Sequence, residues 1–148
     1  VTNLTLSGTY TRQHIRLPEA PNPFVTGNPL VPVYPIFAPK NSASGSIDYR
    51  VPMGAATLVA HLDGNYASSQ YSSTSDPTKS DPSFIVNGRL ALTDIALDEG
   101  AARLELSLWA RNLLDKQYLY LRNTSAALGT YGIFNDPRTY GLTGTVRF

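Results

Sequence analysis

The stretch from residue 103 to 111 reads Arg-Leu-Glu-Leu-Ser-Leu-Trp-Ala-Arg, and it decides the fold. Its even-numbered positions carry Leu, Leu, Leu and Ala, whereas its odd-numbered positions carry Arg, Glu, Ser, Trp and Arg. A helix would mix these two sets on every face, but a β-strand sends successive side chains to opposite faces. This pattern therefore predicts a strand with one apolar face and one polar face.

The same alternation recurs in five further segments, and helical periodicity is weak throughout the chain. These segments cover residues 3–10, 43–50, 57–66, 84–93 and 140–148. An ordinary strand has about 5–6 residues, whereas a tilted strand that crosses a membrane needs about 9–11. The chain is therefore predicted to be all-β, with about six long antiparallel strands in up-and-down order.

The connections between the predicted strands alternate between long and short. The long ones cover residues 14–41, 70–81 and 113–136, and the short ones cover 51–56 and 94–101. Seven of the 11 prolines lie in the first long connection, a density that we expect to forbid a paired strand there. Long loops at one end and short turns at the other are typical of outer-membrane β-barrels.

The aromatic residues of the apolar face lie near the two ends of the predicted strands, and Leu, Ile, Val, Ala and Gly lie between them. Barrel surfaces that face lipid carry aromatic girdles in this way. Four aromatic residues lie at the ends next to the long loops, and two lie at the opposite ends: Tyr10, Tyr66, Phe84 and Tyr140, then Tyr49 and Phe148. The apolar face is therefore predicted to meet lipid and the polar face to line a barrel interior.

Composition excludes several classes of protein. Only 16% of the 148 residues are charged, against about 25% in a typical soluble domain. The net charge of +1 provides no basic field for a nucleic acid, so no nucleic-acid partner is expected. The absence of Cys excludes disulfides and thiolate metal sites. No run of about 18 apolar residues predicts a membrane-spanning helix.

Six strands are too few to close a barrel. The smallest single-chain bacterial barrels have eight strands, and unpaired strand edges are not tolerated in lipid. We therefore expect residues 1–148 to form the C-terminal part of a larger barrel, with the remaining strands on the N-terminal side. The alternating apolar residues that end on Phe148 are typical of a terminal strand that the barrel assembly machinery binds.

Two motifs make the assignment more specific. Residues 106–118 read Leu-Ser-Leu-Trp-Ala-Arg-Asn-Leu-Leu-Asp-Lys-Gln-Tyr, and residues 137–141 read Pro-Arg-Thr-Tyr-Gly. Together they resemble the late strands of TonB-dependent outer-membrane receptors, with the better match over residues 82–148. We interpret the matching residues as structural: Arg111, Asn112, Leu113, Asp115, Tyr118, Pro137, Arg138, Tyr140, Gly141 and Phe148.

The resemblance implies the last six strands of a 22-stranded barrel in the bacterial outer membrane. It also implies energy-coupled uptake of a scarce ligand, such as an iron–siderophore complex. The family's N-terminal plug domain, which contacts the inner-membrane TonB protein, is absent from these 148 residues. The expected partners of the chain itself are outer-membrane lipid, the barrel assembly machinery and a small-molecule ligand.

Candidate ligand contacts lie in the long loops and at the rim. Exposed aromatic side chains can stack on a ligand, or they can equally pack the loops together. The candidates are Tyr34, Phe37, Arg111, Tyr120, Tyr131 and Phe134.

Enzymatic chemistry is disfavoured. His61 and Asp63 share a strand face, but the serines at 68, 69, 72 and 73 lie in a low-complexity loop. A metal site made of His61 and His14 has no third ligand at a suitable spacing. No enzyme activity, metal or cofactor is therefore expected. Two alternatives remain open, namely a passive porin-like channel and a soluble, secreted β-sandwich with a binding role.

Overall fold

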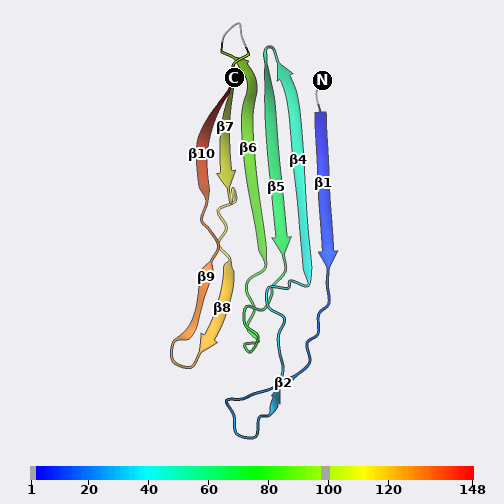
Figure 1. The fold of residues 1–148 in the computed structure, drawn as a ribbon, viewed down its shortest axis with the longest axis vertical. Helices are drawn as coiled ribbons and strands as arrows, with labels where there is room; N and C mark the ends of the chain where they lie inside the picture. The colour runs from blue at the N-terminus through cyan, green and yellow to red at the C-terminus, as the bar shows by residue number, and fades with distance from the viewer. Residues whose placement is uncertain (1–2, 98–100) are drawn as a thin grey trace.

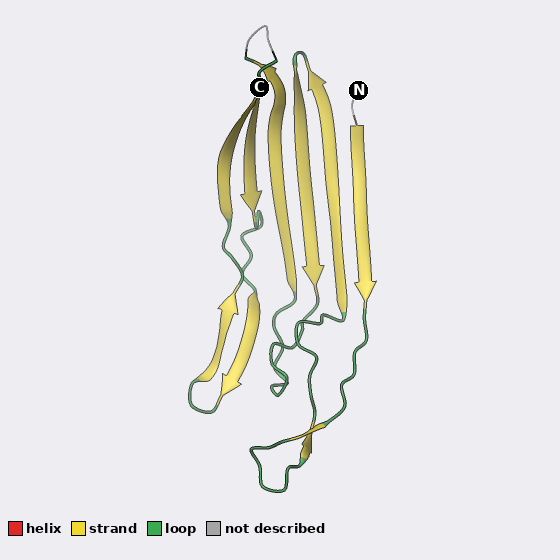
Figure 2. Ribbon diagram, in the orientation of Figure 1, coloured by secondary structure: helices red, strands yellow, loops and turns green. Residues whose placement is uncertain are grey.

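The computed structural model describes residues 3–97 and 101–148, and all of their regular structure is β (Figures 1 and 2). The main sheet has six antiparallel strands, which confirms the number predicted. In chain order and in sheet order they are β1 (Asn3–Arg12), β4 (Asn41–Met53), β5 (Ala56–Ala67), β6 (Ser83–Ala96), β7 (Arg103–Arg111) and β10 (Thr139–Arg147). Nowhere in these two ranges is there a helix of the length and apolar character needed to cross a membrane.

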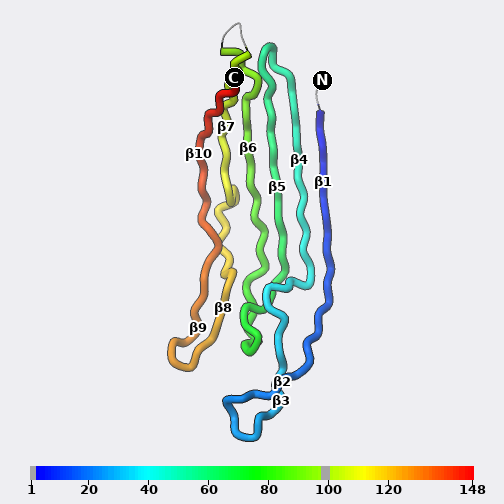
Figure 3. Tube along the Cα trace, viewed as in Figure 1, coloured from blue at the N-terminus to red at the C-terminus, as the bar shows by residue number. Residues whose placement is uncertain are grey.

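Two small sheets lie outside the main one. The first pairs β2 (Ala20–Pro21) with β3 (Leu30–Val31), and the second is a hairpin of β8 (Leu119–Ser125) and β9 (Gly129–Phe134). All three long connections lie at one end of the main sheet, which we call the loop end (Figure 3). The β4–β5 turn, the end of β6, the starts of β1 and β7 and the C-terminus lie at the other end, which we call the turn end (Figure 1).

The register sorts the side chains of the main sheet into two faces. Directly opposed residues share a face, and the apolar positions pair with one another across all six strands. One such row runs Leu6, Ile47, Leu62, Gly88, Ala110 and Tyr140. A row on the opposite face runs Asp48, His61, Arg89, Trp109 and Gly141. The main sheet therefore has an apolar face and a polar face.

No second layer covers the apolar face within the described residues. Large side chains on this face are exposed to solvent: Leu6 has 67% and Leu108 has 59% of its full accessible surface. Among the described residues, Ala91 is the only hydrophobic residue that is buried, and it lies on the polar face. The apolar side chains of this chain therefore line an open surface rather than an internal core.

The turn between β4 and β5 is tighter than the sequence predicted. The strands extend to Met53 and from Ala56, so the turn is Gly54-Ala55 rather than residues 51–56. Gly54 has a φ of 64°, which glycine adopts without a steric penalty and which suits the first position of a two-residue hairpin turn. Pro52 pairs with Thr57 in the ladder, so this proline did not end its strand.

Strand β6 also runs further than predicted, to Ala96 instead of Thr93. A register shift between Leu92 and Ile95 places an extra residue in β6, and Asp94 adopts a φ of 63° there. This β-bulge interrupts the alternation of apolar and polar residues, and the alternation therefore predicted a strand that ends too early. Residues 98–100 of the predicted 94–101 connection lie outside the described residues.

Two predictions about the long loops are wrong. The first loop does hold a short strand pair, in which Pro21 lies opposite Leu30. Proline lacks an N–H group but keeps its carbonyl acceptor, so it is tolerated in a two-residue edge ladder. The segment 113–136 was predicted to be a loop but contains the β8–β9 hairpin, in which Gly129, with a φ of 71°, begins β9 directly after the turn.

Trp109 lies on the polar face and covers Gly141 on the neighbouring strand. A Cβ atom built on Gly141 would lie 2.5 Å from Cζ2 of Trp109, closer than real side chains approach. The indole Nε1 donates a hydrogen bond to the Thr143 hydroxyl at 3.2 Å, and the Arg111 guanidinium lies 5.8 Å from the indole ring. Gly141 therefore provides the space that the indole occupies.

We predict that Gly141→Ala displaces the indole and destabilises the sheet by about 1–3 kcal/mol, because the site is already filled. The chain has a single Trp, so intrinsic fluorescence reports the change directly as an emission shift. Gly144→Ala on the same strand is the matched control, because its Cβ would meet Leu106 at an ordinary 3.6 Å. Equal emission spectra for the two variants would contradict this packing.

Candidate functional site

The three long loops pack against one another at the loop end. Main-chain bonds join the first loop to the second, where the N–H groups of Tyr34 and Phe37 donate to the carbonyls of Thr74 and Tyr71 at 2.9 Å each. The second loop joins the β8–β9 segment, where the Asp81 N–H donates to the Leu119 carbonyl at 2.9 Å. Segments far apart in the sequence thus form one continuous surface.

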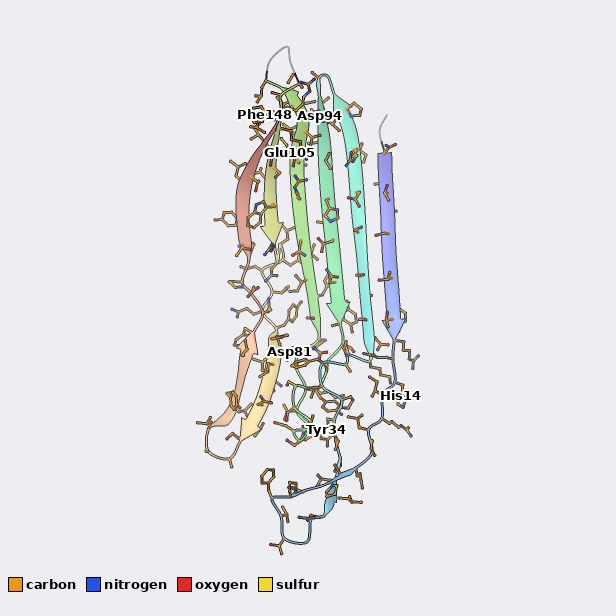
Figure 4. All side chains as sticks on the ribbon, in the orientation of Figure 1. His14, Tyr34, Asp81, Asp94, Glu105 and Phe148 are labelled. Carbon is orange, nitrogen blue, oxygen red and sulfur yellow. The ribbon has the colours of Figure 1, made fainter. Side chains whose placement is uncertain are left out.

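Aromatic side chains fill the space between these loops. The rings of Tyr34 and Tyr71 lie 4.5 Å apart between centroids, and the Lys79 ammonium lies 4.7 Å from the Tyr71 ring. Phe37 stacks on Tyr120 with centroids 6.3 Å apart. Figure 4 shows Tyr34 among the loops below β5 and β6. Three of the six candidate ligand contacts, Tyr34, Phe37 and Tyr120, therefore pack loop against loop.

A polar pocket opens between the same loops. We call it the loop pocket; it has a volume of about 590 Å³ and is lined by Ile36, residues 72–77, Asn123, Thr124 and Tyr131. Its walls are joined directly, because the Ser72 hydroxyl donates to the Arg122 carbonyl at 2.6 Å and accepts from the Arg122 N–H at 3.0 Å. The Asn123 side-chain oxygen Oδ1 is buried and has no hydrogen-bond partner.

Asp76 connects two walls of the loop pocket. Its Oδ1 accepts from the Thr78 N–H at 2.8 Å, and its Oδ2 accepts from the Thr124 N–H at 2.7 Å. Hydrogen bonds from Thr78, and then from Thr124, lower the pKa of Asp76 below the ordinary value of 3.8, because they stabilise the charged carboxylate. Ionised Asp76 therefore helps to hold the second loop against the hairpin.

A second polar feature is the junction that follows β7. Asn112 is only 4% exposed and adopts a φ of 50°. Its side-chain amide donates to the carbonyls of Lys116 and Asp136 at 2.9 and 3.2 Å, and its Oδ1 accepts from the Lys116 N–H at 3.1 Å. Its own N–H donates to Asn87 Oδ1 on β6 at 3.1 Å. One side chain thus ties the start and the end of the 112–138 segment together.

Tyr118, Asp115 and Arg138 of the two motifs complete this junction together with Asn135, which lies between the motifs. The Asn135 N–H donates to the Tyr118 carbonyl at 3.1 Å, and Asn135 Oδ1 accepts from the Tyr118 N–H. The Tyr118 hydroxyl donates to the Phe84 carbonyl at 3.2 Å, and Arg138 pairs with Asp115 at 3.4 Å. Figure 3 shows the two connecting segments crossing between the main sheet and the hairpin. The motif residues therefore position the hairpin and leave few groups free for a ligand.

Charged side chains on the polar face form two clusters. His61 Nδ1 lies 2.7 Å from Asp48 Oδ1, and His61 Nε2 lies 3.6 Å from Asp63 Oδ1. Nearer the turn end, Glu105 pairs with both Arg89 and Arg147. Within residues 3–97 and 101–148, no three His, Asp or Glu side chains converge as a metal ion would require.

The other three predicted ligand residues lie in three different places. Tyr131 lines the loop pocket, whereas Phe134, on the same hairpin, is exposed outside it. Arg111 lies beside Trp109 and lines a separate groove of about 410 Å³ next to the junction. Sequence reasoning missed Asn123 and Asp76, because their roles depend on contacts between the second and third loops that no local pattern encodes.

Comparison with protein-family models, with curated proteins and with solved structures finds no match for this chain.

We predict that Asn112→Gly destabilises the junction by about 2 kcal/mol, because three side-chain hydrogen bonds are lost while the positive φ stays accessible. Asn112→Ala should cost about 1 kcal/mol more, since alanine resists that φ. Limited proteolysis within residues 113–138 would measure the opening. Lys116→Ala is the control, because Lys116 contributes its main chain to these bonds. Equal protection in Asn112→Gly and Lys116→Ala would argue against the junction.

A pH dependence follows from Asp76. Because its pKa is lower in the folded protein, ionised Asp76 stabilises the loops at pH values above 3.8, and this stabilisation is lost as the pH falls through the lowered value. We expect Asp76→Asn to lower the unfolding temperature at pH 6 and the gap from the native protein to close below pH 3.8. A gap that stays constant down to pH 2.5 would contradict this assignment.

Proposed function

We propose that this chain is the C-terminal wall of a TonB-dependent receptor in the bacterial outer membrane. In this proposal its six strands belong to a 22-stranded barrel, with the apolar face on lipid and the polar face lining the interior. The loop end faces the outside of the cell and contributes to binding a scarce ligand, of which an iron–siderophore complex is one example. A plug domain outside these residues would couple uptake to the inner-membrane TonB protein.

The observation that carries the proposal is the uncovered apolar face. Six long strands expose Leu, Ile, Val and aromatic side chains on one side, and no second layer of the described residues shields them. Each square ångström of such surface costs about 25 cal/mol in water, and monomeric soluble proteins rarely expose patches beyond a few hundred Å². Lipid is a solvent in which this face is stable.

The two motifs favour a TonB-dependent receptor over a passive porin-like channel. Their residues build the junction that turns the last loop into an ordered hairpin, and Asn112 and Asp115 take the positive φ values that this junction needs. The charged clusters on the polar face offer partners for a plug inside the barrel. In the same proposal, the strand that ends on Phe148 is bound by the barrel assembly machinery during insertion.

Adjacent substitutions in the middle of β1 test the membrane assignment. Leu6 lies on the apolar face and Ser7 on the polar face, and both are exposed. In lipid, Leu6→Arg should cost about 2–4 kcal/mol and reduce the yield of membrane-inserted protein, whereas Ser7→Arg should leave it nearly unchanged. Outer-membrane fractionation with heat-modifiable gel mobility measures both. In water, either change at an exposed site would stay within about 0.5 kcal/mol.

Equal insertion of the two variants would refute the lipid-facing assignment and favour a face covered by protein, as in a β-sandwich.

Deleting the plug region in the full-length gene separates a TonB-dependent receptor from a passive porin-like channel. A TonB-dependent receptor should lose energy-coupled uptake and gain passive leakage, whereas a porin-like channel would keep its ligand flux.

A further inference from the structure

Basic residues gather where β1 reaches the loop end. Arg12 ends the strand, and His14 and Arg16 follow it at every second position. Lys40 lies beside them, because the Gln13 N–H donates to the Lys40 carbonyl at 3.0 Å. All four basic residues are exposed, and Figure 4 shows His14 next to this end of β1. We call Arg12, His14, Arg16 and Lys40 the basic corner.

The positive charge of the basic corner is not balanced by acidic groups. Residues 1–47 contain Arg12, Arg16 and Lys40 but only one acidic residue, Glu19. Within residues 3–97 and 101–148, no side chain of the basic corner forms an ion pair or a hydrogen bond. By contrast, the arginine of the β8–β9 hairpin pairs with a carboxylate at 3.3 Å. The basic corner therefore presents a surplus of positive charge to its surroundings.

Arg12 extends the apolar face of the main sheet. It lies directly opposite Asn41 on β4, and Asn41 Oδ1 accepts a hydrogen bond from the Tyr10 hydroxyl at 2.8 Å. Since directly opposed residues share a face, Arg12 lies on the same face as Tyr10 and Leu6, which are 65% and 67% exposed. Among the paired residues of the six strands, it is the one charged residue on this face. A cation thus ends the apolar surface, two residues beyond its last aromatic ring on β1.

This combination fits a lipid with an anionic headgroup. An arginine stem can lie along an apolar surface while its guanidinium group reaches the polar headgroups. The planar guanidinium group donates two parallel hydrogen bonds to a phosphate, and Arg and Lys near a membrane surface attract anionic lipids. A free phosphate ion would gain nothing from the apolar face, and an uncharged lipid would gain nothing from the cations. The surface therefore favours a molecule that has both acyl chains and phosphate groups.

We propose that the basic corner binds the phosphate groups of a phosphorylated glycolipid, whose acyl chains lie on the apolar face beside Leu6 and Tyr10. This inference rests on the proposed function, in which the loop end meets the outer leaflet of the outer membrane, because such a glycolipid forms that leaflet. Arg12 binds at the edge of the acyl region, and Arg16 and Lys40 provide further cations around the headgroup. A phosphate monoester on a sugar carries about two negative charges, whereas the phosphodiester of a glycerophospholipid carries one. The basic corner therefore prefers the glycolipid.

Binding of lipid A to the purified full-length protein tests the proposal. Mixed micelles of an uncharged detergent carry the lipid, and native mass spectrometry measures the bound fraction. We expect lipid A with both phosphates to bind about tenfold more tightly than lipid A without phosphates, and inorganic phosphate in millimolar excess to leave it bound. Equal binding of the two forms of lipid A, displacement by inorganic phosphate, or equal affinity for phosphatidylglycerol would overturn the proposal.

Substitutions locate the binding at the basic corner. Arg12→Gln and Arg16→Gln each remove one cation, and each should weaken the binding of lipid A by about fivefold. Arg50→Gln is the matched control, because Arg50 is an exposed arginine on β4 that lies on the polar face, opposite Asn3 near the turn end. This control should change the affinity by less than about twofold. An equal loss of affinity in Arg50→Gln would refute the site.

Unfolding measurements separate a binding role from a structural one. Because the Arg12 and Arg16 side chains have no partner among the described residues, Arg12→Gln and Arg16→Gln should unfold at the temperature of the native protein in lipid-free detergent. Added lipid A should then stabilise the native protein more than either variant. Lower unfolding temperatures of both variants without lipid would assign these arginines a structural role and overturn the proposal.

Failure of this inference is distinguishable from failure of the proposed function. Unequal insertion of Leu6→Arg and Ser7→Arg, without a preference for phosphorylated lipid A, would support the lipid-facing sheet and refute the binding site. Equal insertion of these two variants, with phosphate-dependent binding that Arg12→Gln weakens, would refute the lipid-facing sheet and support the basic corner as an anion site.

Discussion

A single sheet with one continuous apolar face is the constraint on which the rest of the structure depends. The two-residue period of a strand places Leu6, Ile47 and Leu62 side by side, and the register extends that row to Tyr140 on the last strand. Because the described residues provide no second layer, this face has to be covered by something other than these residues. The proposal that lipid covers it explains why the strands are long, why charges avoid this face and why the chain has few charges overall.

The long connections at the loop end are ordered without a hydrophobic core. Hydrogen bonds from polar side chains to main-chain groups hold them in place. Asn112 does this for the last connection, where one buried amide binds main-chain groups at both ends of the 112–138 segment. Asp76 and Ser72 do it between loops, with hydrogen bonds that fix the second loop to the β8–β9 segment. The loop pocket is a consequence of these contacts, so any ligand site there depends on the order of all three loops.

Sequence reasoning succeeded where the physical signal was local. The alternation from residue 103 to 111 predicted β7 with its bounds, and the same signal found all six long strands. It failed where two local signals conflict. The proline density of residues 14–41 argued against a ladder that Pro21 nevertheless joins, and the predicted 51–56 turn included Pro52, which lies in a ladder. The bulge in β6 shifted the alternation before the strand had ended. The β8–β9 hairpin was missed because its strands are short and lie within a segment read as a loop.

The sequence by itself determined the strands, the faces and the end at which the long loops lie, because these follow from a period of two and from the spacing of turns. It also located the motif residues, whose side chains act on main-chain groups nearby. Only the tertiary structure decided which aromatic residues pack loop against loop and which line a pocket. Tyr34 and Tyr131 both lie in long connections, but Tyr34 stacks on Tyr71 and Tyr131 borders the loop pocket. The difference arises from contacts between residues about 40 to 90 positions apart, and such contacts depend on the whole sheet holding the loops at one end.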